Sequence, residues 1–253
     1  MCTLVAAFQH FARAPLVVAA NRDEALGRPA SPPRYFPRGP GGAVAHLAPV
    51  DELAQGTWLG VNEHRLFVAI TNRFGAAPHP ERSSRGLLVK HALAQPSARA
   101  LRTFLAPLRA DAVNAFHLFY ADPREAFVTW SEGEVLHHRT LEPGVYVITE
   151  RSFRGLPSMR EAFVQTLWTA LQKGLAAPDV DGLKTLLRQH LSEDLLGGPC
   201  VHQPAFGYGT RSSMIFALGP SWAASTLLYA DGPPCETPFQ SLAPLLGELG
   251  AGP

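Results

Sequence analysis

The chain is poor in cysteine and carries almost no net charge. Among 253 residues there are three cysteines, and 22 lysines and arginines balance 21 aspartates and glutamates, for a formal net charge of +1. Three scattered cysteines, Cys2, Cys200 and Cys235, indicate neither a disulfide framework nor a Cys-x-x-Cys metal motif. Because the sequence has no block of lysines and arginines, charge does not indicate binding to nucleic acid or to an anionic membrane.

Long apolar runs and several common motifs are also missing. No stretch reaches the ~20 apolar residues that a transmembrane helix needs. The first thirty residues have neither a basic n-region nor an unbroken apolar h-region, so we expect no secretory signal and a cytoplasmic location. The signatures of phosphate-binding loops, dinucleotide-binding turns, zinc hydrolases and serine hydrolases are absent. His137 and His138 are adjacent, but neighbouring residues of a strand point to opposite faces, so no metal site is predicted there.

Cys2 follows Met1 directly and opens an apolar run over residues 2–8. A small second residue favours removal of Met1, after which Cys2 would carry both a thiol nucleophile and a free α-amine. The α-amine has a pKa of about 7.7–8.0, so it can act as a base near neutral pH. One residue could therefore supply both halves of a catalytic pair. The alternative is a small buried residue at the start of a strand, since free cysteine packs as a modest hydrophobe.

A second apolar segment, residues 16–20, runs directly into the charged sequence of residues 21–24. The connection between the two apolar segments has hairpin length, so we expect antiparallel strands that bring Arg22 and Asp23 beside Cys2. In that position a cation would lower the pKa of the thiol, and a carboxylate would orient the amine. The alternative is a solvated turn at the end of the strand.

Further along the chain, runs of strands alternate with pairs of helices. Turn residues and apolar patterns predict later strands at residues 57–61, 66–71, 116–120, 126–130, 135–141, 145–149, 212–218 and 225–229. Helices are expected at residues 83–95 and 96–108, then after a capping box at Ser158 and Glu161, and finally over residues 179–196. The proline-rich and glycine-rich residues 27–42 are expected to form a loop. This order indicates an α+β fold with two antiparallel sheets flanked by helix pairs.

Five short motifs occur in order along the chain. They are Met1-Cys2-Thr3, Asn21-Arg22-Asp23-Glu24, Gly56-Thr57-Trp58-Leu59-Gly60, Thr71-Asn72-Arg73 and Tyr208-Gly209-Thr210-Arg211-Ser212-Ser213. Together they resemble the NRDE family, the transport-and-Golgi-organisation proteins. That family in turn is similar to N-terminal nucleophile hydrolases, close in motif order to bile-salt and penicillin V amidases. The resemblance implies a four-layer αββα sandwich. The length and composition of the chain agree with a single domain over residues 1–253.

The resemblance also assigns site residues beyond Cys2, Arg22 and Asp23. Asn72 occupies the position of an asparagine that helps to bind the oxyanion, although an asparagine that ends a strand in a turn is the alternative. Arg211 matches an arginine near the nucleophile, and a solvated arginine at the start of a strand is the alternative. Trp58 is expected in the core.

The chain departs from the amidase pattern at Glu150. Active relatives carry an asparagine after a Val-x-Thr-like strand end and use it as a donor to the oxyanion. Here the strand end Val147-Ile148-Thr149 is followed by Glu150, and an ionised carboxylate cannot donate a hydrogen bond. A site of this kind would need other donors, such as Asn72 and backbone N–H groups.

Two hypotheses follow. The first is a cofactor-free cysteine hydrolase that acts on a linear amide or a related acyl bond of a small molecule. The second is a non-catalytic relative that handles lipid or haem, with Cys2 or a nearby histidine such as His10 ligating haem iron. The N-terminus separates them, because only the hydrolase needs Met1 removed. The sequence gives neither the substrate nor the oligomeric state.

Overall fold

A computed structural model describes residues 2–39, 43–75, 79–153, 158–192 and 194–251. The chain divides into two compact units. Unit 1 combines Met1–Arg28 with Pro143–Ala243, and unit 2 combines Pro29–Glu142 with Pro244–Pro253. Each unit is built on one antiparallel sheet with helices, so the predicted α+β class with two antiparallel sheets is confirmed. A single domain over the whole chain stays a prediction.

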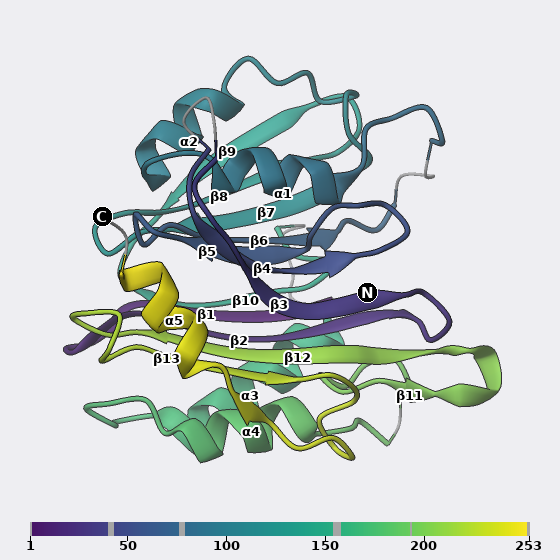
Figure 1. The fold of residues 1–253 in the computed structure, drawn as a ribbon. Helices are drawn as coiled ribbons and strands as arrows, with labels where there is room; N and C mark the ends of the chain where they lie inside the picture. The colour runs from purple at the N-terminus through teal and green to yellow at the C-terminus, as the bar shows by residue number, and fades with distance from the viewer. Residues whose placement is uncertain (1, 40–42, 76–78, 154–157, 193, 252–253) are drawn as a thin grey trace. The chain divides into compact units, whose positions relative to one another are not determined.

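The sheet of unit 1 has the strand order β10-β1-β2-β12-β13-β14, with β11 paired to β12 (Figure 1). Its strands are β1 (Cys2–Phe11), β2 (Ala14–Ala25), β10 (Gly144–Ile148), β11 (His202–Gln203), β12 (Tyr208–Leu218), β13 (Thr226–Ala230) and β14 (Gln240–Ser241). The first two strands form the predicted hairpin. Their apolar segments read as continuous runs because residues on both faces of these strands are buried.

Helices α3 (Met159–Gln172) and α4 (Val180–Arg188) pack on one face of this sheet (Figure 1). The predicted capping box is confirmed: the Ser158 hydroxyl accepts from the backbone N–H of Glu161, and the Glu161 carboxylate accepts from the backbone N–H of Ser158. Helix α4 ends well before the predicted residue 196, because Gln189 leaves the helical conformation with ψ of 140°. A short 3-10 helix, η2 (Pro204–Phe206), precedes β12.

The sheet of unit 2 runs in the order β3-β4-β5-β6-β7-β8-β9. Its strands are β3 (Ala30–Phe36), β4 (His46–Asp51), β5 (Leu59–Asn62), β6 (Phe67–Asn72), β7 (Phe116–Ala121), β8 (Ala126–Ser131) and β9 (Leu136–Leu141). Helices α1 (Arg85–Leu93) and α2 (Ala98–Leu105) bury their apolar faces in its core, and Trp58 packs there as predicted. Ser97, rather than Pro96, begins the second helix, because its hydroxyl accepts from the backbone N–H of Ala100. Helix α5 (Ala243–Gly250) lies near the end of the chain.

The structure corrects two local predictions. Part of the predicted loop over residues 27–42 is strand β3, which lies at the edge of its sheet, where prolines do not interrupt a central ladder. The pairing of β3 with β4 shifts register between Ser31 and Arg34, across the two prolines. The charged residues after residue 20 are not a solvated turn, because β2 continues through them to Ala25.

No helix in the described part of the chain has the length and hydropathy that a membrane span requires.

Candidate active site

The hairpin of unit 1 places Cys2 directly opposite Arg22 in the β1–β2 ladder. Directly opposite residues of antiparallel strands project to the same face, so the thiol and the guanidinium share one face of the sheet. Arg22 is only 6% exposed, and its Nη2 lies 3.8 Å from Oε2 of Glu24. The predicted proximity of Arg22 to Cys2 is therefore confirmed by the register of the strands.

The four residues 21–24 alternate between the two faces of β2. Asn21 and Asp23 point to the face that the helices cover, whereas Arg22 and Glu24 pair with each other on the opposite face. The Asn21 amide donates to the carbonyl oxygens of Leu187 at 2.9 Å and Pro199 at 2.8 Å. Asn21 thus ties the strand to the end of α4 and to the segment before β11.

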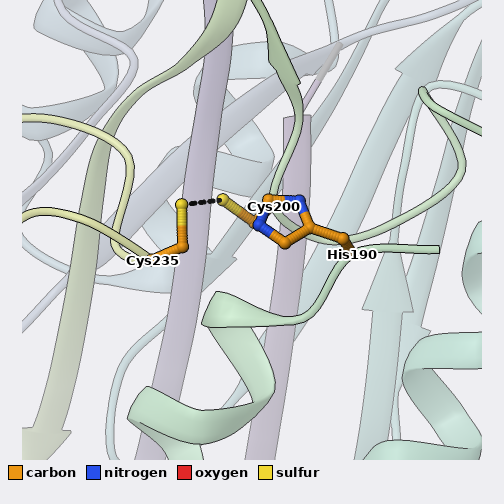
Figure 2. Close-up of side chains that lie close together, drawn as sticks. All are labelled: His190, Cys200 and Cys235. Carbon is orange, nitrogen blue, oxygen red and sulfur yellow. Dashed lines mark hydrogen bonds between the residues drawn. The ribbon is translucent and has the colours of Figure 1, made fainter. Parts of the chain in front are cut away.

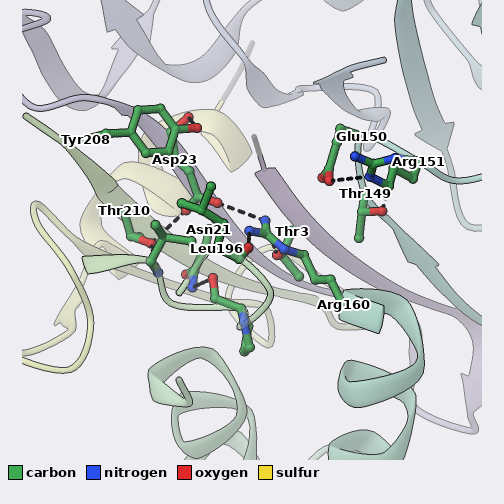
Figure 3. Close-up of polar contacts among 12 residues, drawn as sticks. Thr3, Asn21, Asp23, Thr149, Glu150, Arg151, Arg160, Leu196, Tyr208 and Thr210 are labelled. Carbon is green, nitrogen blue, oxygen red and sulfur yellow. Dashed lines mark hydrogen bonds and ion pairs between the residues drawn. The ribbon is translucent and has the colours of Figure 1, made fainter. Parts of the chain in front are cut away.

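Asp23 is a buried carboxylate with two side-chain donors (Figure 3). Thr210 donates its hydroxyl to Oδ1 at 2.7 Å, and Arg160 donates from Nη1 to Oδ2 at 2.9 Å. The Tyr208 hydroxyl donates to the backbone carbonyl of Asp23 at 3.3 Å. Burial raises the pKa of Asp23, and the charge of Arg160 and the Thr210 hydrogen bond offset part of that effect.

Arg160 belongs to this site although the sequence analysis did not select it. It lies in the first turn of α3, where its Nη1 also donates to the Thr3 hydroxyl at 3.3 Å and its Nη2 donates to the carbonyl of Leu196. Burial lowers its pKa, but the carboxylates of Asp23 and Glu150 outweigh this and raise it. A positive charge near a helix N-terminus is unfavourable because of the helix macrodipole. This unfavourable position of Arg160 is the feature of the sequence that could have indicated a role outside the helix.

Burial raises the pKa of the Cys2 thiol. Arg22 and a hydrogen bond from the Asp23 backbone act in the opposite direction, as expected for a cation and a donor, but they do not outweigh burial and the negative charge of Asp23. Arg22 therefore lowers the pKa of the thiol as predicted, but the effect of burial is larger and the net shift is upward. A nucleophilic Cys2 would need a base to take its proton.

Arg211 lies at an irregularity of β12. The ladder between β2 and β12 pairs Asp23 with Thr210 and Arg22 with Ser212, so Arg211 is the extra residue of a bulge. Its buried Nε has no hydrogen-bond partner among the described residues. The bulge places this arginine in the ladder next to the strand that carries Arg22 and Asp23.

Glu150 follows the end of β10, which pairs antiparallel with β1. Leu4 is opposite Ile148, so continuing the same register by two residues leads from Cys2 to Glu150. The carboxylate is buried, its Oε1 lies 3.7 Å from Nε of Arg151, and its Oε2 accepts no hydrogen bond from a described residue. A buried acceptor therefore stands near the start of β1.

Asn72 belongs to unit 2, where it ends β6 opposite Phe116 and is exposed. Its role beside Cys2 stays a prediction. The neighbouring Arg73 is buried, donates from Nη1 to His117 at 2.6 Å and pairs with Glu132.

His10, the histidine named as a possible haem ligand, and the adjacent pair His137 and His138 make other contacts. His10 stands eight residues from Cys2 on the same strand, roughly 25 Å away at the rise of a β-strand, so it is not the nearby histidine that the haem hypothesis assumed. Its ring packs against Trp168, with centroids 6.0 Å apart. His138 is hydrogen-bonded to Thr129 at 2.9 Å, and the ring of His137 stacks on Trp130.

Solved structures of an amidase, a bile acid hydrolase and an acylase share this fold. The Caenorhabditis elegans ortholog of N-acylethanolamine-hydrolyzing acid amidase has a TM-score of 0.58 at 13% identity, over 85% of this chain and 92% of that chain. A mutant of the conjugated bile acid hydrolase from Clostridium perfringens has a TM-score of 0.57 at 12% identity, over 95% and 96%. Penicillin V acylase from Agrobacterium tumefaciens has a TM-score of 0.53 at 13% identity, over 97% and 88%. The fold is that of the N-terminal nucleophile hydrolases.

The sequence gives a more specific assignment. The family Transport and Golgi organisation 2 (TANGO2) matches residues 1–221. The Transport and Golgi organization 2 homolog of Mus musculus is 26% identical over 159 residues, which cover 62% of this chain. The match spans 54% of the mouse protein, about half of its length. The chain belongs to the TANGO2 family, as the NRDE motifs predicted.

Proposed function

We propose that this chain is a cysteine hydrolase of the N-terminal nucleophile type that cleaves a linear amide or a related acyl bond of a small molecule. The observation that carries this proposal is the pairing of Cys2 with Arg22 beside a buried Asp23 that two side chains hold in place. The solved amidases with the same fold support the reaction class.

In the proposed reaction, loss of Met1 frees the α-amine of Cys2. The amine takes the thiol proton while Sγ forms a bond to the carbonyl carbon, and it then gives that proton to the leaving nitrogen as the C–N bond breaks. Water cleaves the resulting thioester, which releases the acid and restores the thiol. The raised pKa of the thiol fits this scheme, because a protonated thiol needs an adjacent base.

The alternation along β2 gives Arg22 and Asp23 different roles. The thiol shares its face with Arg22, so Arg22, together with Arg211, would bind a carboxylate of the substrate. Asp23 projects to the opposite face, and the main chain of Cys2 lies between the two faces, so Asp23 would orient the α-amine rather than the thiol. Backbone N–H groups would bind the oxyanion, in place of the donor that Glu150 cannot supply.

Intact-mass measurement of the purified protein tests the first requirement, since the proposal needs a mass without Met1. Hydrolysis is then assayed on three compounds that appear in the names of the structural neighbours, N-acylethanolamine, conjugated bile acid and penicillin V. A nitrophenyl ester serves as a fourth substrate. Cys2→Ala should abolish any activity found. Asp23→Asn should lower kcat and move the rising limb of the pH–rate profile to lower pH, because loss of the carboxylate lowers the pKa of the amine.

The matched control is Asp181→Asn, which removes an exposed carboxylate from α4 in the same unit and should leave both kcat and the pH profile unchanged. Retention of Met1, or activity that survives in Cys2→Ala, would refute the hydrolase proposal. Haem-dependent absorbance that Cys2→Ala removes in a protein retaining Met1 would favour the haem-handling alternative instead.

A further inference from the structure

Three side chains with metal-binding atoms meet in unit 1 away from Cys2. The sulfur atoms of Cys200 and Cys235 and a ring nitrogen of His190 all lie within 4.8 Å of one another (Figure 2). His190 follows the end of α4, Cys200 precedes β11, and Cys235 lies between β13 and β14. The spacing of these residues in the sequence does not indicate a cluster, because His190 and Cys235 are 45 residues apart and only folding brings them together.

The geometry of the cluster suits a tetrahedral metal ion. The two sulfur atoms are 3.6 Å apart. Two thiolates at about 2.3 Å from a tetrahedral zinc ion are separated by about 3.8 Å, whereas a disulfide requires about 2.05 Å. The observed spacing therefore admits an ion between the sulfur atoms after a shift of only a few tenths of an ångström.

We propose that Cys200, Cys235 and His190 bind one thiophilic divalent ion of the zinc type. Two thiolates and one imidazole form a donor set that zinc prefers, and the two thiolate charges neutralise the ion. His190 and Cys235 are exposed while Cys200 is buried, so a water molecule can occupy the fourth position.

The surrounding contacts hold the ligands in place without an ion. The backbone N–H of Cys200 donates to the carbonyl of Gln189 at 3.0 Å, and Arg188 donates to the carbonyl of Pro234 at 3.0 Å. These two hydrogen bonds tie together the three segments that carry the ligands.

The proposed ion would stabilise the segment before β11, which is hydrogen-bonded through Thr210 to Asp23 of the candidate active site. Val201 follows Cys200 and donates its backbone N–H to the Thr210 hydroxyl at 2.9 Å, and the same hydroxyl donates to Asp23 at 2.7 Å. The ion would therefore join the end of α4, the segment before β11 and the segment after β13. This role is structural, and it is independent of whether Cys2 is a nucleophile.

The test uses the full chain, reduced with a phosphine and freed of metal by a chelator. Titration with Co²⁺ alone should give the absorption of a tetrahedral thiolate complex at one equivalent, and Zn²⁺ should displace it. Cys235→Ser removes an exposed ligand and should weaken binding by more than about 100-fold, since even loss of an outer-shell partner costs 10–100-fold. His190→Ala should weaken it and change the cobalt spectrum.

Matched controls keep the result interpretable. Cys2→Ser removes the one cysteine outside the cluster, and His91→Ala removes an exposed histidine of α1, so both should bind one equivalent as the wild type does. Circular dichroism of each metal-free variant verifies folding. Failure of the folded wild type to bind, equal affinity in Cys235→Ser, or formation of a Cys200–Cys235 disulfide in air despite equimolar zinc would overturn the proposal. None of these readouts depends on hydrolytic activity.

Discussion

The contact between Arg160 and Asp23 allows a quantitative test of the site's architecture. Replacing Arg160 by Leu keeps an apolar side chain in the same place but leaves the Asp23 carboxylate buried without its cation. The side chains are 3% and 0% exposed, so water cannot replace the lost partner without rearrangement. Removing one partner of a buried pair costs about 3–5 kcal/mol, and we expect that loss in the free energy of unfolding.

Urea titration of wild type and Arg160→Leu measures this cost. A loss of about 3 kcal/mol corresponds to a fall of roughly 6–12 °C in Tm for a chain of this size. The matched control is Arg151→Leu, whose side chain is 46% exposed and pairs with Glu150, and it should change stability by less than about 1 kcal/mol. The double variant Arg160→Leu/Asp23→Asn should recover part of the loss, because it removes the uncompensated charge.

The loss of unfolding free energy in Arg160→Leu should also depend on pH. Burial already raises the pKa of Asp23, so this group favours the folded state at low pH, and the benefit is lost as pH rises through its pKa in the folded protein. Without Arg160 that pKa rises further. The stability difference between wild type and Arg160→Leu should therefore be largest near neutral pH and shrink as pH falls toward 3.8, the ordinary pKa of an aspartate. A cost below about 1 kcal/mol at neutral pH, or one that grows on acidification, would refute the reasoning.

Three further predictions address other parts of the chain. Asn21→Ala removes a buried amide and leaves two backbone carbonyls without a donor, so urea titration should show a loss of about 2–5 kcal/mol. Gly60→Ala places a Cβ atom 2.7 Å from a backbone oxygen and from a leucine methyl group, and should cost about 1–3 kcal/mol, whereas Gly27→Ala meets no atom within 4 Å and should cost less. Glu150→Asn should raise hydrolysis of an ester or amide, by up to about 10²-fold, in an initial-rate assay.

Each of these has a clear contrary result. An Asn21→Ala protein as stable as wild type would mean that the helix-face hydrogen bonds contribute little. Equal costs for Gly60→Ala and Gly27→Ala would contradict the close approach at Gly60. An unchanged or lower rate in Glu150→Asn would show that this carboxylate does not oppose the developing negative charge.

The hairpin could be predicted because it rests on local chemistry, whereas its exact register, which shifts between Phe8 and Phe11, could not. Two apolar segments separated by a short connection predict antiparallel pairing, and that pairing brings Arg22 to the end of β1 that carries Cys2. The burial of the charged residues of β2 could not be predicted in the same way. Charged side chains are usually exposed to solvent. Asp23 can be buried because Thr210 and Arg160, from segments distant in the sequence, donate hydrogen bonds to its carboxylate.

Long-range contacts account for the other differences. Nothing near Arg160 in the sequence indicates a partner 137 residues away, and the capping box beside it predicts the helix but not the ion pair. Cys200 and Cys235 lack a recognisable spacing because each lies in an irregular segment whose path depends on the packing of α4 and β13. Strand β3 could not be predicted because proline disfavours strands. Its prolines are compatible with a strand here because β3 lies at the edge of its sheet.

The alternation along β2 also limits how the length of the hairpin can change in evolution. Deleting or inserting one residue between the turn and Asn21 would exchange the two faces, so that Asp23 would leave Arg160 and Arg22 would enter the helix-covered interior. Changes of two residues preserve the faces, and changes within the turn at residues 12–13 do not affect them. Viable homologues should therefore vary the turn freely and change the strand in steps of two, or by a single residue only where a bulge absorbs it, as bulges do near Phe8 and at Arg211.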